Sequence, residues 1–404
     1  MQKGLKRFLV LLLVIAGTLS GYMYGLSDSA NVLKPTHEAV GVEGIDAKIT
    51  KKLSTILNLI DRDFLNEYDE EALEEGIYKG FVAGLGDKYS VYFDEKEYKI
   101  LLEHTQGSFG GVGIQVSADR GEFIEVVSPI KGTPADRAGI KTGDKITAIN
   151  GEIFLSSQME EAVKVMRGEP GTEVNLSITR LVNGKNENLE FKIVREIINV
   201  DSILSEMLED GIGYIAITGF QERTATEFIE AVEELESRGA KKLVLDLRGN
   251  PGGLLDVTLE IADYLLGEAD IMSVKYKNRP PYIPKSDKEH NPIPMVTLID
   301  KGSASASEIM AGTLKDNGRS EIIGVTTFGK GVVQQIYDIP EIGKKTGMKL
   351  TVGEFFTPKG NKINKVGIAP TIEVILNENV KTIGPSNLKE DTQLQRAIEL
   401  LKKQ

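Results

Sequence analysis

The sequence contains no cysteine and only three histidines, His37, His104 and His290, among its 404 residues. Without cysteine there is no thiol nucleophile, no disulfide framework and no zinc finger. A zinc peptidase lacks support because no His-Glu-x-x-His sequence occurs. We also expect no cofactor of any other kind. No histidine stands beside a Gly-x-Ser-x-Gly turn, so a chymotrypsin-like Ser-His-Asp enzyme is not supported either. A hydrolase made from this chain must take its general base from another residue type.

Positive charge is also scarce. The net charge is −12 and the isoelectric point is near 5.1, whereas a nucleic-acid surface needs a basic stripe. Nucleic acid is therefore not an expected partner. The length is sufficient for two or three domains, each with its own core.

An apolar run at the N-terminus, Phe8–Leu26, follows Lys3, Lys6 and Arg7. As a helix it spans roughly 28 Å, close to the bilayer core of about 30 Å. We interpret it as an uncleaved membrane anchor, and a cleaved signal peptide ending near Ser27–Ala30 is the alternative. In both cases the basic flank predicts that the rest of the chain lies outside the cytoplasm, in the cell envelope or secreted.

Changes in composition and hydrophobic pattern along the chain suggest five segments. After the N-terminal segment come a linker with a helical region, a β-rich region, an alternating region and a helical tail. Their predicted ranges are 1–30, 31–108, 109–196, 197–378 and 379–404.

The helical region shows two apolar stripes with helical spacing. The first consists of Ile45, Ile49, Leu53, Ile56, Leu57, Ile60 and Phe64, and the second of Leu73, Ile77, Phe81 and Leu85. Such helices must pack on something, either a partner subunit or the catalytic domain of the same chain.

Short β-like runs separated by glycine turns fill residues 109–196. The order of motifs, from Phe109–Ile114 through Gly132–Asp144 to Lys145–Gly151, resembles a bacterial PDZ domain. The resemblance makes Gly111, Val112, Gly113 and Ile114 the carboxylate-binding loop. Small residues there let backbone N–H groups converge on a peptide's terminal carboxylate, and the peptide adds as a strand to the sheet edge.

Strands alternate with helices from about residue 199, which predicts an α/β sheet with helices on its faces. The predicted strands are Ile212–Ile217, Lys242–Leu247, Met295–Ile299 and Lys349–Phe356. The predicted helices are Thr224–Glu236, Leu254–Leu265, Ser305–Leu314 and an amphipathic tail helix Thr392–Lys402 at a packing or dimer surface.

A glycine turn follows the second of these strands, in Asp246–Gly253. Backbone N–H groups there can approach a ligand, and the following helix N-terminus favours negative charge. Both properties suit an oxyanion hole. Taken alone, the segment is better explained as an ordinary β–α turn.

A serine-rich turn, Gly302–Glu308, follows the strand that ends near Asp300. Ser303, Ser305 and Ser307 are all candidate nucleophiles, and spacing does not choose among them. The alternative is a capping box, in which Ser305 caps the helix and Glu308 bonds back to it.

Lys330 stands between two glycines and precedes Gln334. If Lys330 begins a helix, the two residues share a face and the glutamine amide can hold the amine. A lysine acts as a base only when neutral, which requires burial to lower its pKa from about 10.4. A solvated lysine in a glycine loop is the alternative.

Together these motifs resemble the carboxy-terminal processing peptidases, over roughly residues 45–376. The resemblance implies a crotonase-like or Clp-protease-like α/β protease core with an inserted PDZ domain. It aligns Ser305 with the nucleophile, Lys330 with the general base and Gln334 with the residue that orients the lysine. It places the oxyanion donors at Ala306 and at Gly252 or Gly253. Two departures from the family pattern are Asp300 in place of asparagine and Thr371 in place of aspartate.

We therefore expect a Ser-Lys endopeptidase that binds apolar protein C-termini through its PDZ domain and forms a homodimer, with no metal. Arg167 is a candidate link between PDZ occupancy and the active site through a carboxylate, or a surface turn arginine. The alternatives are a membrane-tethered PDZ adaptor with an inactive core, and a crotonase-type acyl-CoA enzyme. The intact Ser305, Lys330 and Gln334 set argues against both.

Overall fold

The computed structural model describes residues 42–118, 121–341 and 344–403, and the described residues divide into two compact units, before and after residue 70. In the first unit, helix α2 (Val42–Asp63) confirms the helix predicted from the first apolar stripe. The predicted anchor Phe8–Leu26 lies outside the described residues. Among the residues that are described, no helix is both long and apolar enough to span a bilayer.

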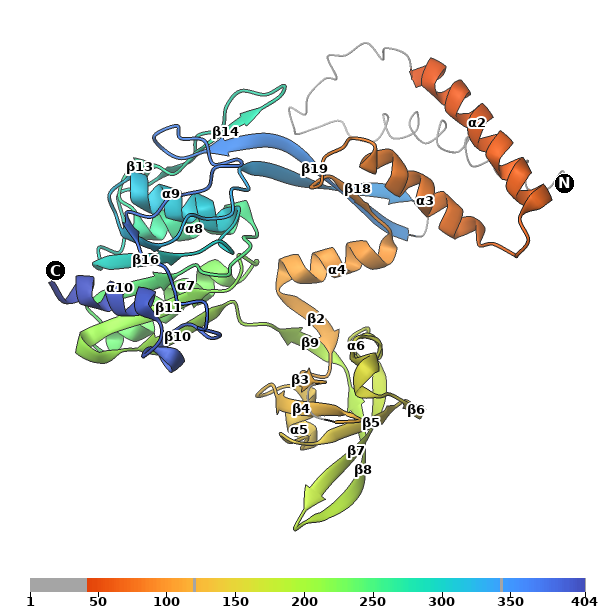
Figure 1. Ribbon diagram of the computed structural model, residues 1–404, viewed down its shortest axis with the longest axis horizontal. Coiled ribbons are helices and arrows are strands. Elements are labelled where there is room, and N and C mark those ends of the chain that lie inside the picture. The colour runs from red at the N-terminus through yellow and green to blue at the C-terminus, as the bar shows by residue number, and fades with distance from the viewer. Residues whose placement is uncertain (1–41, 119–120, 342–343, 404) are drawn as a thin grey trace, which may run out of the picture. The chain divides into compact units, whose positions relative to one another are not determined.

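A six-stranded sheet forms the centre of the second unit, with strand order β10-β11-β12-β16-β17-β20 (Figure 1). All neighbouring pairs are parallel except β10 with β11. The strands are β10 Ile203–Met207, β11 Ile212–Ile217, β12 Lys242–Asp246, β16 Met295–Ile299, β17 Glu321–Gly324 and β20 Ile372–Glu373. Parallel strands end at one edge, so the turns after β12 and β16 lie side by side there.

Both faces of this sheet are buried. Side chains alternate along β12, so Leu243 and Leu245 enter one core and Val244 the other. The first core lies under α7 (Thr224–Ser237), α8 (Leu255–Leu265) and α9 (Ala306–Asp316). The second lies under α10 (Thr392–Lys403), and Figure 1 shows β16 between α8 and α9 on one side and α10 on the other.

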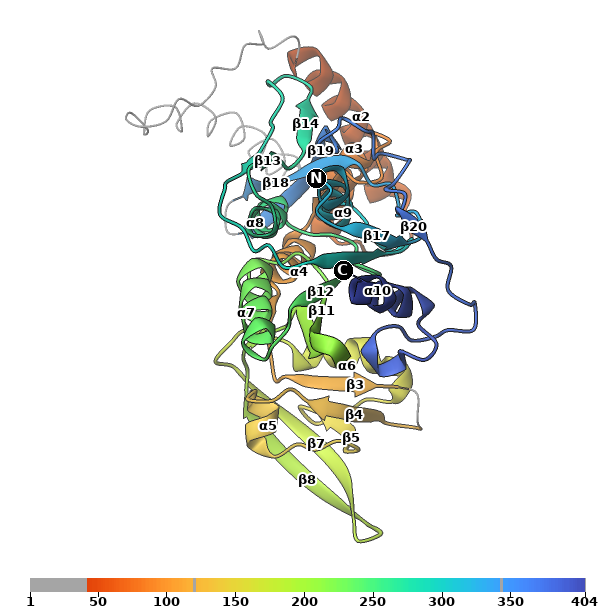
Figure 2. The same cartoon turned by 90° about the vertical axis from the view of Figure 1, so that its left-hand side faces the viewer.

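Helix α10 therefore packs on its own sheet. Leu394, Ala397 and Leu401 are fully buried there, and each leucine contributes about 1.5–3 kcal/mol by leaving water. The sequence predicted that this apolar face lies either at a packing surface or at a dimer surface. The structure shows it packed against the sheet of the same chain (Figure 2).

A second sheet has the order β1-β19-β14, with β18 paired to β19. Its strands are β1 Val91–Phe93, β14 Ser273–Tyr276, β18 Val332–Glu341 and β19 Lys344–Phe356, and a short pair joins β13 Ala269–Asp270 to β15 Lys285–Ser286. The helix considered at Lys330 is wrong, because the chain there enters β18. Val332, Val333 and Ile336 are β-branched residues that favour a strand, and the hairpin partner β19 satisfies their backbone groups.

Two helices precede this region in the chain, α3 (Glu70–Ala83) and α4 (Glu95–Gln106). The second apolar stripe predicted α3, whereas α4 was not predicted. Its signals are present: Asp94 and Glu97 form a capping box, and Gly107 ends the helix in a left-handed conformation with φ 69°.

The β-rich region folds as a separate sheet of order β3-β4-β5-β7-β8, with β6 added to β5. Its strands are β3 Ile114–Ser117, β4 Ile124–Pro129, β5 Lys145–Ile149, β6 Glu152–Ile153, β7 Glu173–Val182 and β8 Lys185–Val194, and its helices are α5 Pro134–Ala138 and α6 Met159–Met166. The chain enters through β2 (Ser108–Gly111) and leaves through β9 (Glu196–Asn199). These two strands pair antiparallel as a two-stranded stem, visible in Figure 1.

Candidate active site

Ser305 occupies the sharp turn between β16 and α9. Its backbone has φ 56° and ψ −113°, a conformation that costs a non-glycine residue of order 1–3 kcal/mol. A strained turn from strand to helix is also how other hydrolases present a nucleophilic serine. The rest of the turn holds the strain, because the residues on both sides of Ser305 are buried.

The three candidate serines differ in what their hydroxyls do. Ser303 Oγ donates to the carbonyl of Leu247 at 2.8 Å, and Ser307 Oγ donates to the carbonyl of Asn250 at 3.0 Å. Both of these serines are fully buried. Their hydroxyls therefore serve to join the two turns, which leaves Ser305 as the serine available for chemistry.

Only one of the two hydrogen bonds of a capping box is present at Ser305. The carboxylate of Glu308 accepts the Ser305 N–H at 2.9 Å, but the Glu308 N–H donates to the Ser305 carbonyl and not to its hydroxyl. The Ser305 side chain makes no cap hydrogen bond. Glu308 thus fixes the turn, while the serine hydroxyl is not consumed by it.

Glu308 joins the serine turn to the lysine segment. It is fully buried, and one carboxylate oxygen, Oε2, accepts both the Ser305 N–H and the Lys330 N–H, the latter at 2.8 Å. The other oxygen, Oε1, accepts the Thr327 hydroxyl at 2.5 Å and the Gly329 N–H at 2.7 Å. The backbones of Ser305 and Lys330 therefore meet at a single atom, although 25 residues separate them in sequence.

The surroundings of Lys330 favour its neutral form. The side chain is half-buried, and this burial lowers the pKa of Lys330 below its usual value. The positive charges of Lys349 and Lys88 lower the pKa further, whereas Glu308 opposes them. Gly331 lets this segment lie close to its neighbour, since a Cβ there would collide with the backbone nitrogen of Asn364.

Gln334 does not hold the Lys330 amine in the manner predicted. It lies on β18 opposite Thr351 of β19, so the expected helical i, i+4 relation does not exist. Its Nε2 donates to the backbone carbonyl of Tyr89 at 2.6 Å. Tyr89 in turn lies beside the lysine, with 5.1 Å between Lys330 Nζ and the ring centroid.

The glycine turn after β12 lies against the serine turn. A Cβ on Gly252 would lie 2.8 Å from Ser305 Cβ and 2.9 Å from the Ala306 nitrogen, so glycine is required at this approach. The Gly252 N–H is already used, because it donates to Asn250 Oδ1 at 2.8 Å. Within the described residues, the N–H groups of Gly253 and Ala306 have no acceptor. Of the two glycines left open by the sequence, the hydrogen bonding favours Gly253 as the oxyanion donor.

The two departures from the family pattern are accommodated locally. Asp300 Oδ1 accepts N–H groups from Gly249, Gly302 and Ser303 at 2.8 to 3.0 Å. An asparagine carbonyl could accept the same bonds, so the substitution preserves the link between the two turns. Thr371 Oγ1 accepts the Ile322 N–H at 2.8 Å, which ties β17 to the segment before β20.

The predicted carboxylate-binding loop lies between the stem and β3. Val112 and Gly113 provide N–H groups that have no acceptor within the described residues, and Gly113 has φ 79°. Gly111 ends β2 and Ile114 begins β3. Among the described strands, β3 pairs with β4 alone, so its other side is a sheet edge that can accept an added strand.

Arg167 has a carboxylate neighbour from outside the PDZ sheet. Its Nη1 lies 3.9 Å from Glu103 Oε2 on α4, and its guanidinium stacks 4.1 Å from the ring centroid of Phe109 on β2. The arginine therefore connects the end of α6 to both the stem and α4.

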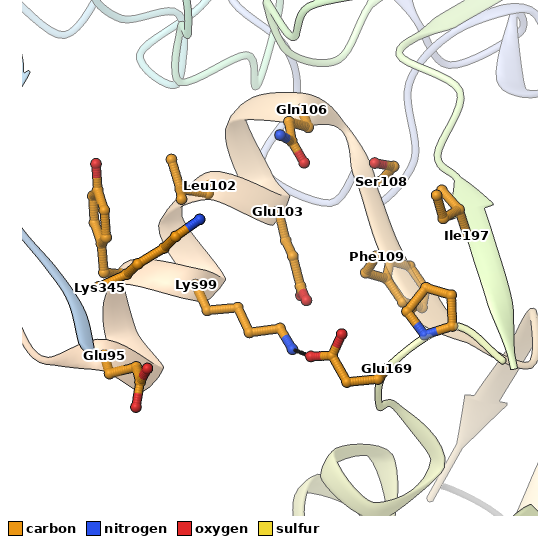
Figure 3. Close-up of a pocket in the computed structure, with 13 residues that line it drawn as sticks. Glu95, Lys99, Leu102, Glu103, Gln106, Ser108, Phe109, Glu169, Ile197 and Lys345 are labelled. Atoms are coloured by element: carbon orange, nitrogen blue, oxygen red, sulfur yellow. Dashed lines mark hydrogen bonds and ion pairs between the residues drawn. The ribbon is translucent and has the colours of Figure 1, made fainter. Parts of the chain in front are cut away.

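A cavity of about 420 Å³ lies at the same junction, and no predicted catalytic residue lines it. Figure 3 shows Lys99 of α4 and Glu169 of the PDZ turn pointing toward each other in it, where they form an ion pair. Glu103 and Phe109 line the same cavity.

Comparison with known proteins identifies the family. The model of peptidase family S41 matches residues 211–374, that of the PDZ domain residues 125–180, and that of the activating protease CtpB N-terminal domain residues 14–97. The carboxy-terminal processing protease CtpA of Bacillus subtilis strain 168 is 37% identical over 385 residues, which cover 94% of this chain and 79% of that protein. The chain belongs to peptidase family S41. It is a serine peptidase of that family with a PDZ domain, which confirms the predicted resemblance, fold class and enzyme class.

The chain is also similar to a second Bacillus subtilis protease in sequence and to a solved structure in fold. The carboxy-terminal processing protease CtpB of the same Bacillus strain is 38% identical and covers 85% of this chain and 71% of that protein. A solved chain from Bacteroides fragilis NCTC 9343, assigned to the S41 proteases, shares the fold with a TM-score of 0.53. It has 17% identity and covers 84% of this chain and 91% of its own.

Two residues of this site were missed as functional candidates. Glu308 was considered only as part of a cap, although its position three residues after a candidate nucleophile was the available signal. Tyr89 gave no signal, because nothing in the sequence relates it to a lysine 241 residues away.

Proposed function

We propose that this S41 peptidase is an extracytoplasmic endopeptidase that recognises protein C-termini through its PDZ domain and cleaves with Ser305 and Lys330. One observation carries the proposal: a single buried oxygen of Glu308 accepts the backbone N–H groups of both residues. A PDZ adaptor with an inactive core has no physical need for this arrangement, or for a lysine whose pKa is lowered by burial.

The proposed reaction begins with transfer of the Ser305 hydroxyl proton to neutral Lys330. Ser305 Oγ bonds to the peptide carbonyl carbon, and the N–H groups of Gly253 and Ala306 stabilise the oxyanion. The ammonium of Lys330 then protonates the leaving amine as the C–N bond breaks. Water attacks the acyl-enzyme with Lys330 again as base, which releases the acid and restores Ser305.

The PDZ domain supplies binding energy away from the cleaved bond. The exposed edge of β3 and the N–H groups of Val112 and Gly113 suit an extended peptide with a terminal carboxylate. The names of the two Bacillus subtilis relatives describe carboxy-terminal processing, which supports the same substrate class for this chain.

The test is cleavage of an unfolded protein with an apolar C-terminus by the full chain. Ser305→Ala and Lys330→Met, each with unchanged circular dichroism, are expected to abolish cleavage. Cleavage that survives both substitutions excludes the mechanism. No cleavage by the wild type, together with tight binding of the same C-terminal peptide, favours the adaptor.

The cell-envelope location rests on Lys3, Lys6 and Arg7 before the apolar run Phe8–Leu26. Protease added to intact spheroplasts is expected to degrade the chain if it lies outside the cytoplasm, and protection of the full length contradicts this.

We also propose that the chain forms a homodimer. Sedimentation of the detergent-solubilised chain measures its mass, and the mass of a single chain contradicts the proposal.

A further inference from the structure

Tyr89 lies outside every motif identified in the sequence but beside the proposed base. It is half-buried in the loop between α3 and β1, and its ring centroid is 5.1 Å from Lys330 Nζ. This separation is within the range of a cation–π interaction. Within the described residues its hydroxyl makes no hydrogen bond, so the ring is the part of the side chain that meets the lysine.

The loop that carries Tyr89 is fixed to the β18–β19 hairpin at one register position. Gln334 and Thr351 face each other across the two strands. The Gln334 amide donates to the Tyr89 carbonyl at 2.6 Å, and the Thr351 N–H donates to Ser90 Oγ at 3.1 Å. Asp87 closes the loop by accepting the Tyr89 N–H and the Ser90 hydroxyl.

We propose that Tyr89 is the positioning residue for the Lys330 amine, and that Gln334 acts on the lysine through Tyr89. This inference rests on the proposed function, in which Lys330 is the general base. The hairpin that brings Lys330 into the site also fixes the ring against which its amine lies. The glutamine thus holds the backbone of the positioning residue and not the amine.

The Tyr89 ring stabilises the Lys330 side chain most strongly after the amine has taken the serine proton. A neutral amine gains little from an aromatic face, whereas an ammonium gains attraction to the ring quadrupole. Tyr89 therefore stabilises the charge that develops in the transition state. The charged groups facing Lys330 from the surrounding elements are Lys349 on β19, Lys88 in the Tyr89 loop and Glu308 on α9. Lys88 also lies over the Tyr89 ring, at 4.6 Å.

The test compares Tyr89→Leu with the conservative variant Tyr89→Phe in the full chain, using cleavage of a fluorogenic peptide. Leucine fills similar apolar space but has no ring. We expect kcat to fall about tenfold with KM unchanged. We also expect the acid limb of the kcat/KM profile to move down by roughly half a pH unit, because the ammonium loses its ring. Tyr89→Phe is expected to keep the wild-type midpoint.

The pH midpoint is independent of how much enzyme folds, so partial unfolding cannot mimic this result. A midpoint that stays in place or rises in Tyr89→Leu overturns the proposal. Gln334→Leu is expected to shift the midpoint as Tyr89→Leu does, and to cause no further loss of kcat in the Tyr89→Leu background. A full additional loss in the double variant means that Gln334 acts independently of Tyr89.

Ser305→Ala and Lys330→Met distinguish this inference from the proposed function. If both abolish cleavage while Tyr89→Leu behaves like the wild type, only the role of Tyr89 fails. If either variant retains wild-type cleavage, the Ser-Lys mechanism itself fails.

Discussion

Glu308 shows how one residue can set the geometry of a whole site. Its side-chain carboxylate accepts four hydrogen bonds, two on each oxygen. A buried carboxylate with four donors restrains the serine turn and the lysine segment together. Its charge also acts on Lys330, whose pKa it raises against the larger effect of burial.

We therefore predict that Glu308→Gln lowers both stability and activity. A glutamine has only one acceptor oxygen, so two donors at the other position face an NH₂ group. The loss of charged hydrogen bonds is expected to reduce the free energy of unfolding by about 3 kcal/mol in a urea titration. Glu399→Gln, which affects exposed pairs with Arg396 and Lys403, is the matched control and is expected to leave the urea midpoint almost unchanged. Equal costs for the two variants contradict the prediction.

Lys349 gives a second prediction, on pH dependence. Its positive charge lowers the pKa of Lys330, so its removal favours protonated Lys330 and raises that pKa. In Lys349→Met, the rise of kcat/KM with pH is expected to move to higher pH than in the wild type. Lys349→Arg keeps the charge and is expected to leave the midpoint in place. A midpoint that stays in place or falls in the methionine variant contradicts the prediction, because the charge of Lys349 lowers the pKa of Lys330 and its loss cannot lower that pKa further.

At the scale of elements, helix α10 is attached to the glycine turn by buried charges. Arg248, within the turn, pairs with Asp246 and with Asp391 just before α10, at 2.6 and 2.8 Å. Asp391 also accepts the Leu394 N–H in the first turn of the helix. The tail helix therefore helps to fix the loop that carries the proposed oxyanion donor Gly253.

Asp391→Asn is predicted to destabilise the chain by about 3 kcal/mol, because it breaks a buried ion pair. Burial opposes ionisation of Asp391, but the bond and charge of Arg248 keep the pKa of Asp391 below its usual value. The stabilisation is therefore present above about pH 4 and is lost as the pH falls through the folded-state pKa. Urea titrations at several pH values measure both effects, and the variant is expected to lose less stability in acid.

The exposed pair between Asp210 and Lys402, at 2.7 Å, supplies the control for this prediction. Asp210→Asn also removes a contact of α10, and asparagine tolerates the φ of 60° at this position. We expect it to cost much less stability than Asp391→Asn, because solvent screens an exposed ion pair. If the two variants lose similar amounts of stability, the buried ion pairs of Arg248 do not stabilise the chain more than an exposed pair does.

At the scale of the whole molecule, the PDZ sheet is inserted between α4 and β10, and the β2–β9 stem carries the chain in and out. Arg167 contacts the stem through Phe109 and approaches Glu103 of α4. This arrangement supports the hypothesis that PDZ occupancy is coupled to the active site, and names Glu103 as the carboxylate partner.

We predict that Arg167→Ala and Glu103→Ala each reduce the stimulation of cleavage by a C-terminal peptide, without changing the peptide's Kd. Coupling energies between sites are commonly about 1–3 kcal/mol, which corresponds to roughly 5- to 150-fold. Lys192→Ala removes an exposed pair with Glu173 inside the PDZ sheet and is expected to leave stimulation unchanged. Stimulation that is unchanged in Arg167→Ala disproves the gating role.

The sequence by itself determined part of the secondary structure and the site motifs. Strand β16 and helices α7 to α10 follow from apolar periodicity, which is local, and the glycine and serine turns follow from residues that are adjacent in the chain. Local pattern could not decide β18, because its strand is stabilised by a partner on β19. It also could not choose among the three serines, since their hydroxyls are distinguished only by acceptors from the neighbouring β12 turn.

Only the tertiary structure joined Glu308 to Lys330 and placed Tyr89 beside that lysine. Those contacts depend on the parallel order of the sheet and on the β18–β19 register, which bring distant segments to one edge. The burial that lowers the pKa of Lys330 has the same origin. It is a property of everything packed around the amine, so no pattern of neighbouring residues encodes it.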